Sequence, residues 1–310
     1  MPMISISHKA KQFLILAIKL SIVVAAFYFI YHQLATNDKL DWTKFIVLFK
    51  KKQSVLGIVF ILFLSFVNRF FEILKWQNLV SSFKIISLGE ATKQVLASLT
   101  AGIFTPNGIG EYAGKTLYFE KSNAKKIIFL NLLCNGIQLI LTIILGTIGL
   151  LFLGYTFWGF AILVFVLVFL VFCFFSKKIQ LKGYSLENLL SKINEIPKKI
   201  HKKNIVLGAV RYLVFSHQYY FLFVAFDVHL PYFTLMATIA TVYFLASSLP
   251  SFQFLDFAIK GSVAVFFFSL LGVNEWIVVF VTTLMWFLNV VIPVIIGGFY
   301  VLNFKPQWKL

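Results

Sequence analysis

Residues 103–115 read IFTPNGIGEYAGK and interrupt long apolar stretches with a proline, glycines and charged side chains. A second interruption, LPSFQFLDFAIKG at residues 249–261, repeats the order of features: a proline, an acid five or six residues later, and a lysine four residues after the acid. Side chains four apart share one face of a helix. Each interruption therefore predicts a break followed by a helix with an internal ion pair, Glu111 with Lys115 and Asp256 with Lys260.

Paired breaks in the two halves of a membrane protein indicate a binding site near the middle of the bilayer. A charged side chain inside hydrocarbon costs about 2.5–3.5 kcal/mol on insertion scales, so we interpret these charges as functional. The alternative is two proline kinks whose ion pairs only satisfy their own charges.

The composition is that of an integral membrane protein. Hydrophobic residues make up 60% of the 310 residues, charged residues make up 13%, and the mean hydropathy is +0.90. No ten-residue segment alternates as a barrel strand would. The prediction is an all-α, polytopic helical membrane bundle of about 7–8 spans, with broken or re-entrant helices. Apolar runs of spanning length lie near 14–34, 54–80, 127–153, 157–175, 205–229, 232–249 and 275–303.

The net charge of +17 comes mainly from lysines at the ends of the apolar runs. Such lysines favour contact with anionic lipid head groups, at about 1 kcal/mol each near the surface. No segment is long enough to be a soluble basic domain, so nucleic-acid binding is not expected. Cys134 and Cys173 lie in apolar runs without CxxC spacing, so no disulfide framework, metal site or cofactor is predicted.

Residues 176–204 form the longest hydrophilic stretch, with eight lysines against two glutamates. By the positive-inside rule this loop is cytoplasmic, which predicts a multi-pass protein of the cytoplasmic (inner) membrane. Its leucines and isoleucines recur at helical spacing, so it forms either an amphipathic helix on the membrane or a plain solvated linker. The predicted organisation is one transmembrane domain over 1–310, with a first half at 1–175 and a second half at 205–310.

One break in each half suggests an internal duplication whose orientation the sequence leaves open. If residues 88–120 form a re-entrant pair of half-helices, the N-terminus and the lysines at 84–93, 121–126 and 176–204 share one side. This distribution favours re-entry. It also places the lysines between 39 and 52 on the opposite side, against the same rule.

Both arginines of the chain, Arg69 and Arg211, fall within predicted spans. Arginine suits buried pairing and bidentate recognition of phosphate. Arg69 lies one turn from Glu72, which predicts an ion pair that is either structural or part of a site. Arg211 either lines a groove or extends toward the cytoplasmic interface.

The two acid-bearing helices complete the candidate site. The acids lie near helix N-termini, where the helix dipole favours them, and the free backbone amides expected there suit a phosphate. We assign the lysines and Arg69 to the phosphate, and the acids to orienting the lysines or contacting a cationic head-group amine. No catalytic or metal-binding residue is predicted. The candidate substrate-binding residues are Thr105, Asn107, Gly108, Gly110, Glu111, Lys115, Asp256, Lys260, Arg69, Glu72 and Arg211.

The segment TPNGIGE at residues 105–111 resembles the lysylphosphatidylglycerol synthase transmembrane region family, which are flippase-like membrane proteins. Leu74-Lys75-Trp76, Arg211-Tyr212 and Leu249-Pro250 are further matches. The resemblance implies a polytopic helical protein that binds or translocates phospholipids, aminoacylated lipids or polyprenyl-linked lipids. The second break departs from the Gly-rich, Arg-Glu pattern of relatives. The chain ends at Leu310 without a soluble aminoacyltransferase domain, so synthase activity is not expected.

The expected function is a membrane lipid flippase or transporter that binds and translocates the head group of an anionic or aminoacylated phospholipid, or of a polyprenyl-linked lipid. It is not expected to be an enzyme. One alternative is a membrane-embedded transferase acting on a lipid-linked substrate, although its usual carboxylate pair or metal cluster is not evident. A structural membrane subunit is another. The expected partners are membrane phospholipids or lipid-linked head groups, and homo-oligomerisation stays open.

Overall fold

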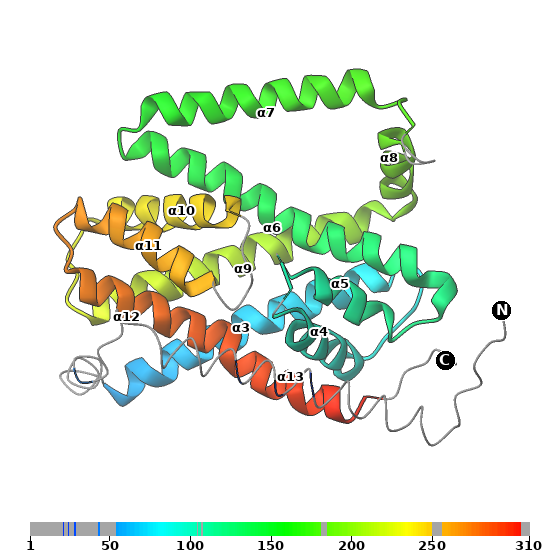
Figure 1. Cartoon of the computed structure of the whole chain (residues 1–310), viewed down its shortest axis with the longest axis horizontal. Helices are drawn as coiled ribbons and strands as arrows, with labels where there is room; N and C mark the ends of the chain where they lie inside the picture. The colour runs from blue at the N-terminus through cyan, green and yellow to red at the C-terminus, as the bar shows by residue number, and fades with distance from the viewer. Residues whose placement is uncertain are drawn as a thin grey trace.

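The computed structural model describes residues 54–103, 105–106, 108–180, 185–249 and 256–304, with four isolated residues before them. All elements in these ranges are helices (Figure 1), which confirms the all-α prediction. The predicted first span at 14–34, the side chain of Asp256 and the whole of Asn107 lie outside what is described.

The helices follow the chain in two groups separated by a short amphipathic helix. The first group is α3 (Val55–Val80), α4 (Leu88–Gly102), α5 (Ile109–Thr116), α6 (Ala124–Phe152) and α7 (Thr156–Ser176). The short helix is α8 (Leu186–Glu195). The second group is α9 (Lys198–Ala225), α10 (Tyr232–Ser248), α11 (Asp256–Ser269), α12 (Glu275–Trp286), a π-helical turn at Phe287–Val291, and α13 (Ile292–Leu302).

Four helices in the described part are long and apolar enough to cross a membrane. α10 and most of α11 are apolar but shorter. The bundle is therefore of a membrane type, while the figure of about 7–8 spans stays a prediction. The four helices are Val55–Val80, Lys121–Phe152, Thr156–Ser176 and Glu275–Leu302.

The first break joins α4 and α5 into an antiparallel hairpin. A Cβ on Gly110 would lie 2.8 Å from the carbonyl oxygen of Ala101, and a Cβ on Gly114 would lie 3.0 Å from Ser98 Oγ. Ala101 and Gly110 flank the break closely, whereas Ser98 and Gly114 lie farther from it on either side. α5 therefore runs back along α4. The structure thus contains two antiparallel helices where a re-entrant pair was predicted, and their re-entry into a membrane stays a prediction. α10 and α11 also pack against each other across the second break.

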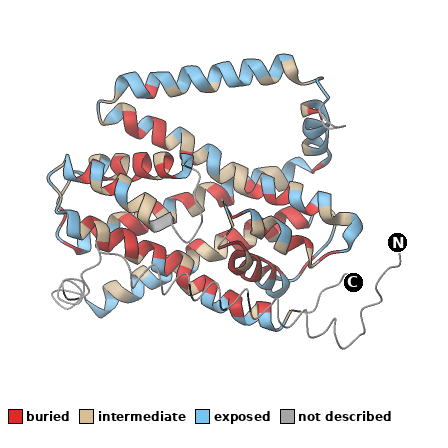
Figure 2. Ribbon diagram, in the orientation of Figure 1, coloured by how far each residue is buried: buried red, intermediate tan, exposed pale blue. Residues whose placement is uncertain are grey.

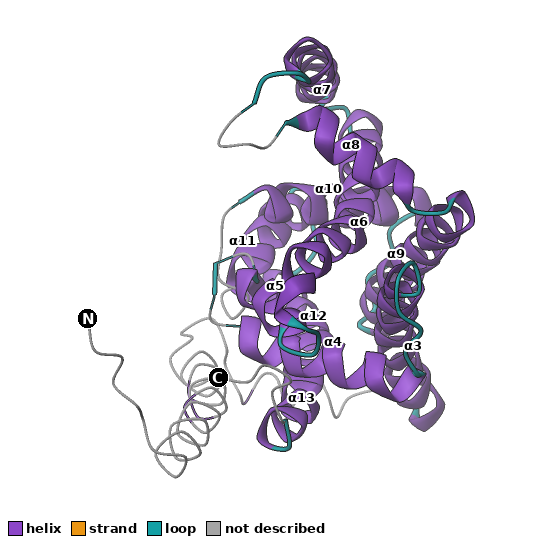
Figure 3. Ribbon diagram, turned by 90° about the vertical axis from the view of Figure 1, so that its right-hand side faces the viewer, coloured by secondary structure: helices purple, strands orange, loops and turns teal. Residues whose placement is uncertain are grey.

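The two groups of helices are intertwined. α6 packs along α10 and α13 packs along α4, while α3 and α9 lie side by side (Figures 1 and 3). α3 and α9 run antiparallel, because Asn78 Nδ2 donates to the Ile200 carbonyl (2.9 Å) at one end and Gln218 Nε2 donates to the Ile61 carbonyl (3.1 Å) toward the other. Each group therefore packs long helices against the other group.

α7 and α8 lie at the edge of this bundle. α7 is exposed along almost all of its length and buries only Gly159 (Figure 2), as expected of an apolar helix that faces lipid. Ser185 Oγ accepts a hydrogen bond from the Asn188 amide (3.1 Å) and so caps α8. The loop at 176–204 therefore contains the amphipathic helix rather than only a plain linker.

Candidate functional site

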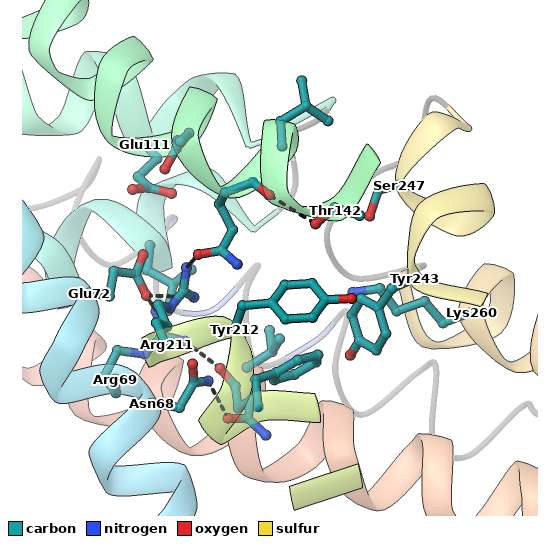
Figure 4. Close-up of a pocket in the computed structure, with 17 residues that line it drawn as sticks. Asn68, Arg69, Glu72, Glu111, Thr142, Arg211, Tyr212, Tyr243, Ser247 and Lys260 are labelled. Atoms are coloured by element: carbon teal, nitrogen blue, oxygen red, sulfur yellow. Dashed lines mark hydrogen bonds and ion pairs between the residues drawn. The ribbon is translucent and has the colours of Figure 1, made fainter. Parts of the chain in front are cut away.

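A polar cavity of about 420 Å³ lies between the two groups of helices (Figure 4). Side chains from α3, α4, α5, α6, α9, α10, α11 and the π turn line it, so it exists only in the complete bundle. Eleven of its 17 lining residues are polar or charged, and two more are tyrosines. Polar groups of this density are costly inside an apolar bundle unless they are paired or bind a ligand.

Two guanidinium groups converge on one carboxylate in this cavity (Figure 4). Arg69 Nη1 donates to Glu72 Oε2, and Arg211 Nη2 donates to the same oxygen at 3.2 Å. The side chains of Arg69, Arg211 and Glu72 are 13%, 20% and 10% exposed, so the cluster is largely shielded but still reachable. Arg211 Nη1 also donates to Gln138 Oε1 at 3.5 Å, which places the Arg211 guanidinium group inside the bundle, beside α6.

The position of Arg69 depends on a proline in another helix. Pro293 has no N–H, so the carbonyl of Asn289, four residues earlier, lacks its helical donor. The helix widens here into the π turn, and the freed Asn289 carbonyl accepts a hydrogen bond from Arg69 Nη2. π turns often occur at functional sites. The Asn289 side chain is fixed as well, by Asn68 Nδ2 at 2.7 Å and by Gln218 Oε1 at 3.0 Å.

The predicted ion pair of the first break is confirmed. Lys115 Nζ donates to Glu111 Oε1 and to Asn131 Oδ1, both at 2.6 Å, and lies 4.6 Å from the centroid of the Trp76 ring. Lys115 is only 1% exposed. Glu111 lines the cavity, whereas Lys115 lies behind it and neutralises its charge. The assignment of Lys115 to a phosphate stays a prediction.

The backbone amides at the start of α5 are already bonded, and the prediction that they are free is wrong. Thr105 Oγ1 accepts a hydrogen bond from the Gly110 amide at 2.8 Å, and the amides of Gly108 and Glu111 donate to backbone carbonyls within the turn. Gly108 has a left-handed backbone, with φ of 69°. Thr105, Gly108 and Gly110 therefore shape the turn and bring α5 against α4.

The second break contributes Lys260 to the cavity. Its ammonium lies 5.0 Å from the centroid of the Tyr243 ring, and both side chains line the cavity. α11 begins at Asp256, so the acid does follow the break at a helix start, as predicted. The pairing of Asp256 with Lys260 lies outside the described side chains.

A polar stripe on α6 was not singled out from the sequence, although its spacing is visible there. Asn131, Asn135, Gln138 and Thr142 recur every three or four residues in an apolar run. The last three line the cavity, and Asn131 holds Lys115. Helical periodicity of polar residues in a predicted span is the signal that would have found them.

The cavity is electropositive and has unused hydrogen-bond donors. Its described lining carries Arg69 and Arg211 against Glu72, while the charge of Glu111 is compensated by Lys115 from behind. The Nε atoms of both arginines are buried and have no hydrogen-bond partner among the described residues. Buried cationic donors without partners are costly, so the arrangement favours an anion with several acceptor oxygens.

No metal site competes with this interpretation in the part of the chain that the structure covers, where no group of three His, Cys, Asp or Glu side chains converges. Comparisons with protein-family models, curated proteins and solved structures find no match for this chain. The resemblance to the lysylphosphatidylglycerol synthase transmembrane region family therefore stays a prediction.

Proposed function

We propose that the protein is a multi-pass membrane protein that binds the anionic head group of a phospholipid, or of an aminoacylated or polyprenyl-linked lipid, and moves it across the bilayer. The convergence of Arg69 and Arg211 on the single carboxylate of Glu72 carries this proposal. A phosphate can accept charge-assisted hydrogen bonds from two guanidinium groups at once. The cavity of about 420 Å³ falls within the roughly 300–1,000 Å³ of small-molecule sites, which suits a head group whose acyl chains remain in lipid.

The distribution of lysines supports an orientation in the membrane. The connections 81–87 and 117–123 and residues 177–180, at the end of α7, lie at one end of the bundle and contain lysines (Figure 1). The connections 153–155, 226–231 and 270–274 lie at the other end and contain no lysine or arginine. By the positive-inside rule the first end is cytoplasmic.

Matched glycine contacts support an internal duplication. A Cβ on Gly146 of α6 would lie 2.1 Å from Phe244 Cβ on α10, and a Cβ on Gly297 of α13 would lie 2.2 Å from Thr100 Oγ1 on α4. Phe244 and Thr100 each stand six residues before the proline of their own break. The long helical segment that follows each hairpin, α6 or α12–α13, thus meets the hairpin of the other half at the same position.

The arginines follow the same correspondence. Arg69 of the first half contacts Asn289 in the second half, and Arg211 of the second half contacts Gln138 in the first. Asn289 and Gln138 each stand eight residues before the glycine of the matched pair, Gly297 or Gly146. The two guanidinium groups therefore occupy equivalent places, one from each half.

The antiparallel packing of α3 and α9 sets the relation between the halves. A two-fold axis that exchanges two antiparallel helices is perpendicular to both, so it lies in the membrane plane if the helices span. The halves are then inverted-topology repeats, with the α4–α5 hairpin entering from the cytoplasmic end and the α10–α11 hairpin from the opposite end. In transporters built this way, the site lies at the repeat interface and opens to each side in turn.

Cysteine labelling tests this topology. In a variant with Cys134 and Cys173 replaced by alanine, we expect Ser81→Cys and Ser122→Cys to react with a membrane-impermeant maleimide only from the cytoplasmic side. Ser269→Cys should react only from the other side. All three serines are exposed. Labelling of Ser81→Cys and Ser122→Cys from opposite sides would exclude the re-entrant hairpin, and cytoplasmic labelling of Ser269→Cys would exclude inverted repeats.

Lipid movement in proteoliposomes tests the function itself. We expect a fluorescent phosphatidylglycerol to cross the bilayer faster with the protein than in protein-free liposomes, and faster than the matched phosphatidylcholine, because the cavity is electropositive. The readout is the fraction of label that dithionite reduces from outside. The same assay is run with aminoacylated and polyprenyl-linked lipids. The proposal would be contradicted if none of these lipids, phosphatidylglycerol included, crossed the bilayer faster with the protein than without it.

A further inference from the structure

A second cavity, of about 390 Å³, lies at the lysine-rich end of the bundle. It is bounded by the end of α3, the start of α6 and the C-terminal half of α8, and it shares no lining residue with the central cavity. Its polar lining includes Ser82, Lys125, Lys126, Lys192 and Glu195.

The lining of this second cavity suits an anion. It carries three lysines against one glutamate. Ser82 lines the cavity, and its Oγ is buried without a hydrogen-bond partner among the described residues. α6 begins here without a side-chain cap, so the positive end of its dipole adds to the lysines.

Other features of the cavity point to a lipid rather than a soluble ion. Phe129 and Leu130, on the helix predicted to span, form part of its wall. α8 covers the cavity from one side, exposes Leu189 and Leu190, and is held at its end by His201, whose Nε2 lies 2.8 Å from the Ile193 carbonyl oxygen. A polar mouth with an apolar wall beside an amphipathic helix matches an anionic phospholipid, with its phosphate at the lysines and an acyl chain along α6.

We propose that this cavity binds the phosphate of an anionic phospholipid of the cytoplasmic leaflet, at a site separate from the central cavity. The bound lipid joins α8 to the start of α6 and the end of α3. The proposal uses the orientation argued above but does not depend on transport. We therefore expect the lipid in the second cavity to stay bound even if the protein moves no lipid across the bilayer.

Native mass spectrometry of the full-length protein with added phosphatidylglycerol tests the site. The variant Lys125→Gln/Lys126→Gln/Lys192→Gln should lose one bound lipid, with affinity on the order of 100-fold weaker, since each lysine near an anionic lipid corresponds to about a fivefold change. Lys198→Gln/Lys199→Gln/Lys202→Gln removes the same charge from exposed positions outside the cavity and should retain that lipid. Gel filtration and far-UV circular dichroism check that both variants fold.

Two further arms separate the alternatives. Arg69→Gln/Arg211→Gln should lose the central lipid and keep this one, so failure of the proposed function leaves a different pattern from failure of this site. Inorganic phosphate is the probe for a soluble anion, and it should raise the melting temperature far less than phosphatidylglycerol does. Equal lipid loss in the two lysine variants, or equal stabilisation by phosphate, would overturn the proposal.

Discussion

The variants Arg69→Gln and Arg211→Gln are each expected to bind anionic lipid about 10- to 100-fold more weakly than the wild-type protein. A hydrogen bond to a charged group contributes about 1.5–3 kcal/mol, and each variant removes the guanidinium donors of one half from the central cavity. The double variant should show no saturable binding there. Native mass spectrometry with phosphatidylglycerol measures the affinity, and the proteoliposome assay measures the transport rate.

The conservative variant Arg211→Lys separates charge from geometry. Lysine keeps the positive charge but cannot present two parallel donors, so we expect binding between that of wild type and Arg211→Gln. Lys198→Gln, an exposed position, is the control for the loss of one positive charge. Wild-type affinity in both arginine variants, with the fold intact, would show that the arginine cluster only holds the helices together.

The sequence predicted the parts of this site that depend on spacing within one helix. Glu111 and Lys115 stand four apart and Arg69 and Glu72 stand three apart, and both pairs form. Arg211 reaches Glu72 only because α3 and α9 pack antiparallel, and no local pattern encodes that contact. The spacing of charges along one helix was sufficient to predict the two ion pairs. That Arg69 and Arg211 share the Glu72 carboxylate could be seen only in the tertiary structure.

What the sequence prediction got wrong, and what it left out, has the same origin. The amides at the start of α5 were expected to be free, but the hydroxyl of Thr105, five residues before Gly110, bonds one of them across the turn. Pro293 is a visible helix-breaking signal, yet the partner of the carbonyl it frees is Arg69, 220 residues away from Asn289. Local signals therefore indicate where a backbone group is left unpaired, and only the fold supplies its partner.

Glu72→Gln is expected to lower the stability of the lipid-free protein and to raise its affinity for an anionic lipid. Removing the carboxylate leaves two largely buried guanidinium groups without a counter-charge, and breaking a buried pair costs about 3–5 kcal/mol. A bound phosphate restores the missing negative charge and no longer competes with Glu72. Thermal unfolding in detergent, with and without phosphatidylglycerol, should give a lower melting temperature without lipid and a larger increase with lipid than in wild type.

The opposite signs of these two changes distinguish two roles for Glu72. In the first role, the Glu72 carboxylate occupies the place of the head-group phosphate at the two guanidinium groups. Glu72→Gln then lowers the stability of the lipid-free protein and raises its affinity for the lipid, because one anion substitutes for the other. If Glu72 instead orients the arginines for the lipid, both quantities fall together, and that result would contradict the exchange. Glu187→Gln makes the same substitution at an exposed position on α8 and should change neither quantity. The counterpart of Glu72 in the second half, three residues after Arg211, is Val214, so a single carboxylate serves both arginines and a single anion is enough to replace it.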